Sequence, residues 1–446
     1  MGTDQGDASL PGRGRGSKSA RLEAGSAGPE GAPPSTDRPV FRVDQSGARC
    51  RSVQARRDGH ALSFEGCSRN EGEDGSVHTR SSPVLVADAG SSSLRLTVFG
   101  DGGHVLNEHH SESPPGKGAI QALRQLLKEG PPPAAAGHRI VHGGPELRSH
   151  TLLDDAVRAR LTQVAELAPL HVPQALTVVD AARELLPGVP HVACFDTVFH
   201  SGLTAAAREY AVPTGWRETY GLRRYGFHGL SYAWALARAA ELLGRRPERL
   251  HLVMVHLGGG CSACAVRDGR SVDTTMGFTP LEGLVMSRRS GSIDPGALTW
   301  LLTGKNLAAN EIEDVLNQRS GLLALSGTSG DTRDLVRSRT AGDERAALAL
   351  DVFTHQCRRG IAGMAASLSR LDALVFTGEI GEDQPEIREE VCAGLSVFGL
   401  TGGLRPLVAE RPEMVSEPGA RVPVVVIPTG EAQQINVETR ALLNRA

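Results

Sequence analysis

Residues 84–99 read VLVADAGSSSLRLTVF and predict a strand, a turn of small residues and a returning strand. The run 84–87 is continuously apolar, as in a buried strand, and 94–99 alternates with the period of two typical of strands. The same pattern returns at residues 252–266, LVMVHLGGGCSACAV, with glycines at its turn. The two turns lie 168 residues apart, from Gly90 to Gly258. This repetition predicts two similar halves with a cleft between them.

Helical patterns fill the segments between the strands. We expect helices over residues 155–167 and 173–186, and further strands over 373–376 and 422–427. Strands that alternate with helices indicate the α/β class. One long amphipathic helix is expected where apolar residues recur near helical spacing, at Leu348, Val352, Cys357, Ile361, Met364 and Leu368.

Residues 1–82 differ in composition from the rest of the chain. They are rich in Gly, Ser, Arg, Asp and Glu and show neither a helical nor a strand period. Such a segment buries too little apolar area to offset the entropy lost on ordering. We therefore expect either a disordered tail or an extension that results from a misplaced start codon.

Composition excludes several classes of protein. A net charge of −3 over 446 residues argues against a dedicated nucleic-acid or membrane-surface binder. The sequence lacks a run of 18 apolar residues and an apolar segment of the secretory type at its start, so we expect a cytoplasmic protein without a membrane span. Seven scattered cysteines indicate reduced thiols rather than a disulfide framework.

Lysine is scarce, which limits the chemistry available. Of the 48 basic residues only four are lysines, so 48 − 4 = 44 are arginines. None of the four lysines stands in a P-loop motif, which excludes a P-loop nucleotide site by motif. A Schiff-base enzyme is disfavoured for the same reason.

Four segments suit phosphate binding: two are turns of small residues, and two contain an arginine among small residues. Backbone N–H groups converge at Gly/Ser turns such as 88–93 and 258–262, and small side chains let phosphate oxygens approach. Arg139 lies in GHRIVHGG (137–144), and Arg289 lies in SRRSGSIDP (287–295). A guanidinium in such a setting suits bidentate binding of carboxylate or phosphate, although surface ion pairs are the ordinary alternative.

Acids and histidines follow the predicted strands. Asp196 ends the apolar run 191–195 and Glu431 follows the last strand; Mg²⁺ typically takes one or two such carboxylates. The alternative for Asp196 is a helix N-cap. His171, His228 and His256 lie beside Gly- or Pro-rich turns. The pair Cys261 and Cys264 lacks the second pair that a metal site requires.

The chain from Val84 to the C-terminus resembles the acetate kinases, members of the acetate and sugar kinase, Hsp70 and actin superfamily. The resemblance implies a duplicated two-lobe actin-like ATPase (ribonuclease H-like) fold with a central cleft. The implied lobes are residues 83–195 plus 433–446 and residues 196–432. The segments that carry it are VLVADAGSSSLRL, GHRIVHGG, ELAPLH, CFDTVFH, RRYGFHGLS, HLGGGCS, MGFTPLEGLVM, RSGSIDP, SGLLALSG, FTGEIGE and VIPTGE.

The resemblance implies Mg²⁺-dependent reversible phosphoryl transfer between ATP and acetate, giving acetyl phosphate and ADP in a homodimer, with Mn²⁺ as an alternative ion. The implied catalytic residues are Arg139, Asp196, His228 and Arg289, of which His228 and Arg289 stabilise the transition state. Arg139 also binds substrate beside an apolar acyl pocket, and the metal is assigned to Asp88 and Glu431. The pocket residues are Val141, Leu170, Phe227 and Pro280. The nucleotide residues are Arg95, His256, Leu257, Gly258, Gly259, Gly260, Asp331, Thr332, Arg333, Glu379, Ile380, Gly381 and Glu382.

Several positions depart from the family pattern, mostly on the nucleotide side. Gly259 replaces an Asn donor, Thr332 replaces an aromatic residue, and Glu379 replaces a Gly. The others are Asp88 for Asn, Arg95 for Lys, Val172 for Asn and Gly430 for Asn. We therefore expect the reaction class to be kept and the nucleotide affinity or identity to differ.

Two alternatives to an acetate kinase remain open. One is a kinase for propionate or another short-chain acid, or one with a different phosphoryl donor. The other is a catalytically weak homologue that binds nucleotide or acyl phosphate. The presence of Arg139, Asp196, Arg289 and Glu431 argues against the second, while Gly259 and Glu379 leave it open.

Overall fold

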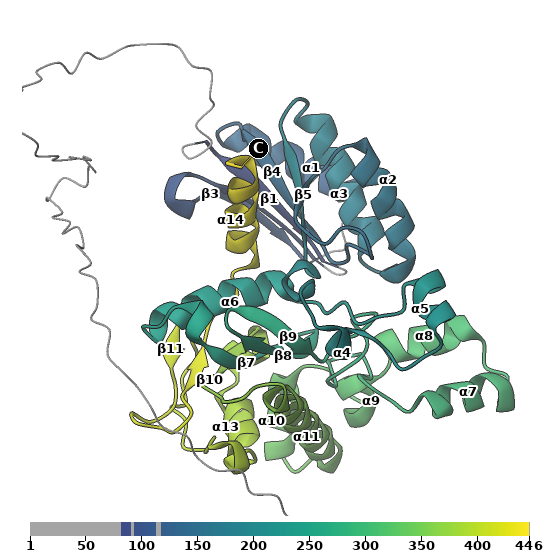
Figure 1. Cartoon of the computed structure of the whole chain (residues 1–446), viewed down its shortest axis with the longest axis vertical. Helices are drawn as coiled ribbons and strands as arrows, with labels where there is room; N and C mark the ends of the chain where they lie inside the picture. The colour runs from purple at the N-terminus through teal and green to yellow at the C-terminus, as the bar shows by residue number, and fades with distance from the viewer. Residues whose placement is uncertain (1–81, 91–92, 113–116, 446) are drawn as a thin grey trace, which may run out of the picture. The chain divides into compact units, whose positions relative to one another are not determined.

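The computed structural model describes residues 82–90, 93–112 and 117–445 (Figure 1). The expected tail, apart from Ser82, lies outside the described residues, as do Ser91 and Ser92 of the first turn. The first described strand starts at Val84, the first residue of the apolar run.

The first half of the described chain forms a six-stranded sheet in the order β3-β2-β1-β4-β6-β5. Its strands are β1 (Val84–Ala89), β2 (Leu94–Phe99), β3 (Val105–Ser111), β4 (Ala135–Ile140), β5 (Thr151–Leu152) and β6 (His191–Phe195). β1 pairs antiparallel with β2 and parallel with β4, and β4 pairs parallel with β6. The carboxyl ends of β1, β4 and β6 therefore meet at one edge of the sheet.

The second half repeats this topology, in the order β11-β12-β10-β7-β8-β9. Its strands are β7 (His251–Leu257), β8 (Cys261–Arg267), β9 (Arg270–Thr274), β10 (Ala373–Thr377), β11 (Glu413–Met414) and β12 (Val424–Val426). β7 pairs antiparallel with β8 and parallel with β10, which pairs parallel with β12. The predicted duplication and the α/β class are confirmed.

Helices cover both faces of each sheet. On the first sheet, α1 (Lys117–Glu129) and α3 (Val172–Leu185) pack on one face, and the C-terminal helix α14 (Glu431–Leu443) packs on the other (Figure 1). On the second sheet, α11 (Glu344–Ala366) and α6 (Gly229–Leu242) take opposite faces. The other helices are α2 (Asp155–Val164), α4 (Ala205–Arg208), α5 (Thr214–Tyr220), α7 (Pro295–Gly304), α8 (Ala309–Gln318), α9 (Gly321–Ser326), α10 (Thr332–Thr340), α12 (Glu379–Asp383) and α13 (Pro385–Ala393).

The predicted elements exist, with differences at their ends. The helix expected over 155–167 is α2 followed by a 3₁₀ turn at Ala165–Leu167, and the final strand is shorter than the run 422–427. The apolar face assigned to α11 is wrong at Leu348, which is 53% exposed. At this end of the helix Ala349, Leu350 and Phe353 are buried against the sheet instead, whereas Cys357, Ile361 and Met364 are buried as predicted.

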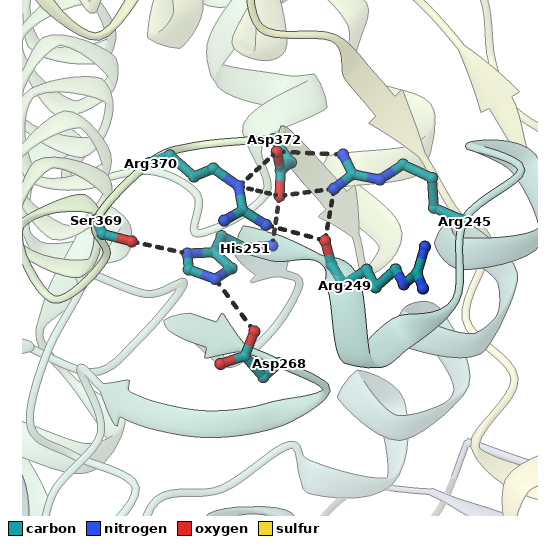
Figure 2. A network of polar contacts seen from close by, with 7 residues as sticks. All are labelled: Arg245, Arg249, His251, Asp268, Ser369, Arg370 and Asp372. Atoms are coloured by element: carbon teal, nitrogen blue, oxygen red, sulfur yellow. Dashed lines mark hydrogen bonds and ion pairs between the residues drawn. The ribbon is translucent and has the colours of Figure 1, made fainter. Parts of the chain in front are cut away.

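Figure 2 shows a polar network at the amino ends of β7 and β10. The Asp372 carboxylate accepts hydrogen bonds from Arg370 Nε (3.1 Å) and from the backbone N–H of His251 (2.8 Å). It also pairs with Arg245 Nη1 at 3.1 Å, and both arginines donate to the carbonyl of Arg249. One carboxylate thus ties together the chain segments that begin two parallel strands.

Among the described helices, none has the length and hydrophobicity needed to cross a bilayer.

Candidate active site

A cavity of about 610 Å³ brings together residues from both halves of the described chain. The carboxyl ends of β1, β4 and β6 supply one wall, and the glycine turn after β7 supplies part of the other. The four predicted catalytic residues all line it. The other predicted residues that line it are Asp88, Arg95, Val141, His171, Phe227, His256, Gly258, Gly259, Gly260, Pro280, Glu379 and Glu431.

Arg139, in β4, lies between two carboxylates at the ends of the neighbouring strands β1 and β6. Its Nη2 is 2.9 Å from Asp196 Oδ2, its Nε donates to the same carboxylate, and its Nη1 is 3.1 Å from Asp88 Oδ1. Burial alone would lower the pKa of Arg139, but the charges of Asp196 and Asp88 hold that pKa well above its ordinary value. Burial raises the pKa of Asp196, and the guanidinium offsets only part of that rise. Asp196 does not cap the 3₁₀ turn Val198–His200, which follows it.

Glu431 stands at the first position of α14 and faces the same carboxylates. No hydrogen bond or ion pair joins its carboxylate to another residue in the described part of the chain. Burial, together with the charges of Asp88 and Asp196, raises the pKa of Glu431 to about 7 despite Arg139. Within residues 82–90, 93–112 and 117–445, no three acids, histidines or cysteines are close enough to form a complete metal cage.

Two stacked imidazoles face the glycine turn. The rings of His228 and His256 lie 4.1 Å apart at 21°. Burial lowers the pKa of His256 to about 3, and burial, with the electrostatic effects of the adjacent His256 and of Arg139, lowers the pKa of His228 well below its ordinary value. His171, across the cavity, has its pKa lowered to about 3 by burial and by the charges of Arg289 and Arg139. These histidines are therefore neutral hydrogen-bonding groups at pH 7.

Arg289 is a half-buried cation without a carboxylate partner among the described residues. Its Nη1 donates to the carbonyl of Pro280 at 3.1 Å, and burial lowers its pKa. The loop that holds it is packed tightly against Gly321, whose φ is +64° and whose Cβ would lie 2.7 Å from the Arg289 carbonyl oxygen. A glycine is required there. The guanidinium is thus presented to the cavity by a fixed loop.

His228 and Arg289 converge on Gly260. A Cβ at Gly260 would lie 3.1 Å from His228 Nε2 and 3.5 Å from Arg289 Nη1. The glycine turn, an imidazole and a guanidinium therefore surround one small region of the cavity. Such an arrangement of donors suits a tetrahedral or trigonal oxyanion.

The predicted acyl pocket is only partly assembled. Val141, Phe227 and Pro280 line the cavity, and the rings of His142 and Phe227 meet edge to face at 5.3 Å. Leu170, by contrast, is 38% exposed and lines a neighbouring cavity of about 290 Å³. Pro280 lines both cavities, so Leu170 adjoins the predicted pocket through Pro280 without lining the first cavity.

A second cavity of about 290 Å³ adjoins the glycine turn, with Gly258, Gly259 and Glu379 in the linings of both. Asp331, Thr332, Arg333 and Ile380 line it too, as predicted for a nucleotide site. Leu257 and Gly381 are buried outside both linings, and Glu382 accepts hydrogen bonds from the backbone of Gly378 and Thr429 (3.0 and 2.8 Å). These three residues support the loops rather than face the cavities.

Sequence reasoning missed several lining residues. Thr429 and Gly378 lie inside segments that carried the resemblance, so the signal was present, whereas His110 and Glu112 at the end of β3 had none. The others in the second cavity are Ser287, Arg288, Ser329, Gly330, Asp383 and Gln384. Cys261 and Cys264 are buried in β8, where burial raises both thiol pKa values to about 12.

The chain is similar in sequence to known proteins. The acetokinase family matches residues 117–437. The acetate kinase of Desulfitobacterium hafniense (strain DSM 10664 / DCB-2) is 41% identical over 332 residues, 74% of this chain and 82% of that protein. The acetate kinase of Acetivibrio thermocellus is 44% identical over 327 residues, 73% of this chain and 80% of that protein.

Two solved structures are also similar to this chain. Porphyromonas gingivalis acetate kinase matches with a TM-score of 0.73 and 32% identity, over 81% of this chain and all (100%) of that one. A propionate kinase from Francisella tularensis subsp. tularensis SCHU S4 matches with a TM-score of 0.74 and 30% identity, over 81% of this chain and 99% of that one. The fold and the cavity thus define an enzyme of the kinase class with the expected actin-like fold. The chain belongs to the acetokinase family, which confirms the expectation of an acetate kinase.

Proposed function

We propose that this enzyme transfers a phosphoryl group between ATP and acetate in a direct in-line reaction that gives acetyl phosphate and ADP. The observation that carries the proposal is the convergence of His228 Nε2 and Arg289 Nη1 on Gly260. Phosphoryl transfer needs little covalent help; it needs positioned donors and positive charge on the equatorial oxygens. His228 and Arg289 supply both without a lysine.

In this proposal Arg139 positions the acid, and Asp196 positions Arg139. The bidentate contact with Asp196 fixes the plane of the guanidinium at the cavity wall. The apolar side chains of Val141, Phe227 and Pro280 hold the methyl group. Desolvation of these charges strengthens their interaction with the charge that develops in the transition state.

The described residues fit a Mg²⁺ ion that is carried largely by the nucleotide. Mg²⁺ commonly takes one or two protein carboxylates and completes its shell with water and phosphate oxygens. Glu431, which has no hydrogen-bond or ion-pair partner in the described chain, and Asp88 offer such oxygens, although they form no complete cage. When bound, the ion would neutralise charge on the phosphate oxygens; Mn²⁺ would serve with the same ligands.

The adenosine is assigned to the second cavity. Asp331 and Arg333 pair at 2.7 Å at its rim, and Thr332 is almost fully buried, at 1% exposure. The residues proposed to bind nucleotide remain Arg95, His256, Gly258, Gly259, Gly260, Asp331, Thr332, Arg333, Glu379 and Ile380, with Leu257, Gly381 and Glu382 behind them. The carboxylate of Glu379 stands beside the glycine turn and weakens phosphate binding in this proposal.

A second acid, propionate, is favoured by the position of Leu170. Because this side chain is 38% exposed and lines the adjoining cavity beside Pro280 instead of the first cavity, an added methylene meets little resistance from it. Such a methylene changes discrimination by only about 1–3 kcal/mol in an apolar pocket. We therefore propose acetate as the main substrate and propionate as a secondary one.

The test is formation of acetyl phosphate, trapped as its hydroxamate, by the purified full-length chain with ATP, Mg²⁺ and acetate. Turnover is expected, and its absence at saturating substrates would falsify the kinase proposal in favour of a homologue that only binds these ligands. Parallel kcat/KM values for acetate, propionate and butyrate identify the acid. The same comparison among ATP, GTP and pyrophosphate identifies the phosphoryl donor.

The organisation of the chain is part of the same proposal. We assign residues 83–195 plus 433–446 to one lobe and 196–432 to the other, supported by the packing of α14 on the first sheet. A cytoplasmic homodimer, with no nucleic-acid or membrane partner, is proposed from the family. Size-exclusion chromatography with light scattering tests the dimer.

A further inference from the structure

Two buried polar side chains, Tyr232 of α6 and Ser262 of β8, lead by hydrogen bonds to the partly buried His228 at the cavity. Tyr232 OH lies 2.6 Å from Ser262 Oγ, and Ser262 Oγ lies 2.9 Å from His228 Nδ1. Tyr232 and Ser262 are both fully buried, with 0% exposure, and neither lines the cavity. The opposite ring nitrogen, His228 Nε2, is the atom that lies beside Gly260.

The direction of these hydrogen bonds follows from counting protons. The 2.6 Å contact allows either oxygen to donate, but a phenol has one proton, and Ser262 Oγ is the one acceptor within hydrogen-bond distance of Tyr232 OH among the described residues. If Tyr232 donates to Ser262, then Ser262 donates to His228 Nδ1, and every proton has an acceptor. The reverse direction would leave the phenol proton buried without an acceptor, which is costly. The neutral imidazole therefore carries its proton on Nε2.

We propose that Ser262 and Tyr232 are positioning residues that hold His228 in its Nε2–H tautomer, so that a neutral imidazole donates to the phosphoryl oxygen. This inference rests on the proposed function for its catalytic meaning. The opposite tautomer would turn a lone pair toward phosphate oxygens and repel them. A tautomer fixed before substrate binds needs no reorganisation during the reaction.

The backbone conformation at His228 supports the inference that this side chain is held in one position. Its φ is +58° and its ψ is +24°, a left-handed conformation that side-chain-bearing residues seldom adopt. Such a conformation persists only where surrounding contacts impose it, and it occurs preferentially at functional sites. Stacking on His256 and the bond to Ser262 are two such contacts. His228 is thus held in place from the backbone, the ring face and Nδ1.

The inference is tested on the full-length protein with ¹⁵N-labelled histidine. The ¹⁵N chemical shifts of His228, identified by comparison with His228→Gln, report which ring nitrogen carries the proton without any need for turnover. We expect a protonated Nε2 in the wild type from pH 6 to 8. In Ser262→Ala we expect the Nδ1–H tautomer to be populated, and Ser262→Thr should restore the wild-type shifts.

Kinetics supply the second readout. Ser262→Ala should lower kcat by about 10- to 100-fold, with KM for ATP and acetate changed less than threefold. Tyr232→Phe, which keeps the ring, should show a smaller loss of the same kind and serves if Ser262→Ala fails to fold. Ser271→Ala is the matched control, because Ser271 Oγ bonds the buried His200 Nδ1 at 2.7 Å outside the cavity.

A wild-type His228 protonated on Nδ1 would overturn the inference. So would a Ser262→Ala variant with unchanged shifts, or a Tyr232→Phe variant without any effect on shifts and kcat. Absence of acetyl phosphate formation by the wild type would instead refute the proposed function. In that case the ¹⁵N shifts would still decide whether the tautomer is held.

Discussion

Arg139 and Asp196 form a buried ion pair across two parallel strands, with Nη2 and Oδ2 2.9 Å apart. The strands are neighbours, and Asp196 N also donates to the carbonyl of Ile140, next to Arg139. Asp88 holds the third guanidinium nitrogen from β1. The cation proposed to meet the substrate is therefore oriented by carboxylates before substrate arrives.

Asp196→Asn should lower kcat by roughly 100-fold or more, because the guanidinium loses the charged partner that orients it. Asp88 remains as a partner of Arg139, so we expect the free energy of unfolding to fall by about 1–3 kcal/mol. A wholly unpaired buried charge would lower it further. Hydroxamate assays and urea unfolding measure the two effects. Asp180→Asn, which breaks an exposed 2.6 Å pair with Arg158, is the control and should change neither much. Wild-type kcat in Asp196→Asn would refute the orienting role.

Asp88→Asn should raise the Mg²⁺ concentration needed for half-maximal activity several-fold, since a neutral amide is a weaker ligand for a hard cation than a carboxylate. We expect kcat at saturating Mg²⁺ to stay within about tenfold of wild type, because Asp196 still orients Arg139. Mg²⁺ titrations at fixed ATP give both values. Identical titrations for variant and wild type would remove Asp88 from the metal site.

Glu379→Gly should lower KM for ATP by roughly three- to tenfold, because a carboxylate beside the phosphate turn repels the nucleotide. Glu379 lines both cavities, whereas acetate is assigned only to the first. KM for acetate should therefore hold steady. The control is Glu386→Gly in the first turn of α13, a comparable acid outside both linings. An unchanged or higher KM for ATP would show that Glu379 does not oppose binding.

Stability should fall on acidification through the buried histidines. Burial and the charges of His191 and Arg183 lower the pKa of His138 to about 3, so the folded protein keeps it neutral. An unfolded chain protonates it below about pH 6.5, so the free energy of unfolding is lost as pH falls from 6.5 toward 3, by at most about 1.4 kcal/mol per pH unit for this group.

His138→Gln removes one of those titrating groups, and its loss of stability between pH 7 and 5 should be smaller than that of wild type by about 1–2 kcal/mol. Urea unfolding at the two pH values measures it. His355→Gln, on the exposed side of α11, should leave the wild-type difference intact. An equal pH dependence in wild type and His138→Gln would contradict the assignment.

Asp372→Ala should destabilise the fold without changing the chemistry. The carboxylate ties two arginines and the first N–H of β7 at the edge of the sheet (Figure 2). Loss of several partly buried hydrogen bonds to a charge costs about 2–4 kcal/mol. Thermal unfolding measures the loss, and kcat below the melting range should equal wild type. A lower kcat with an unchanged Tm would reverse this interpretation.

Much of the fold could be read from residue patterns, because buried strands and small-residue turns leave short-range signals. The two hairpins, β10 and most of α11 follow from them. Leu348 shows the limit: its spacing fitted the helix, but which stripe is buried depends on the sheet beneath α11. The lining residues His110 and Glu112 carried no local signal, since the pairing of β3 with β2, which sets His110 opposite Arg95, brings them to the cavity.

By itself the sequence determined the family, the repetition of two halves and the identity of the cationic and acidic groups. Only the tertiary structure decided how those groups are used. It pairs Arg139 with Asp88 and Asp196, 51 and 57 residues away. It leaves Arg289 without a carboxylate partner among the described residues, and it places Leu170 in the lining of the neighbouring cavity instead of the first one. A sequence motif shows which side chains are present. The distances between them depend on which strand ends meet in the fold, and their protonation depends on how far the fold excludes water.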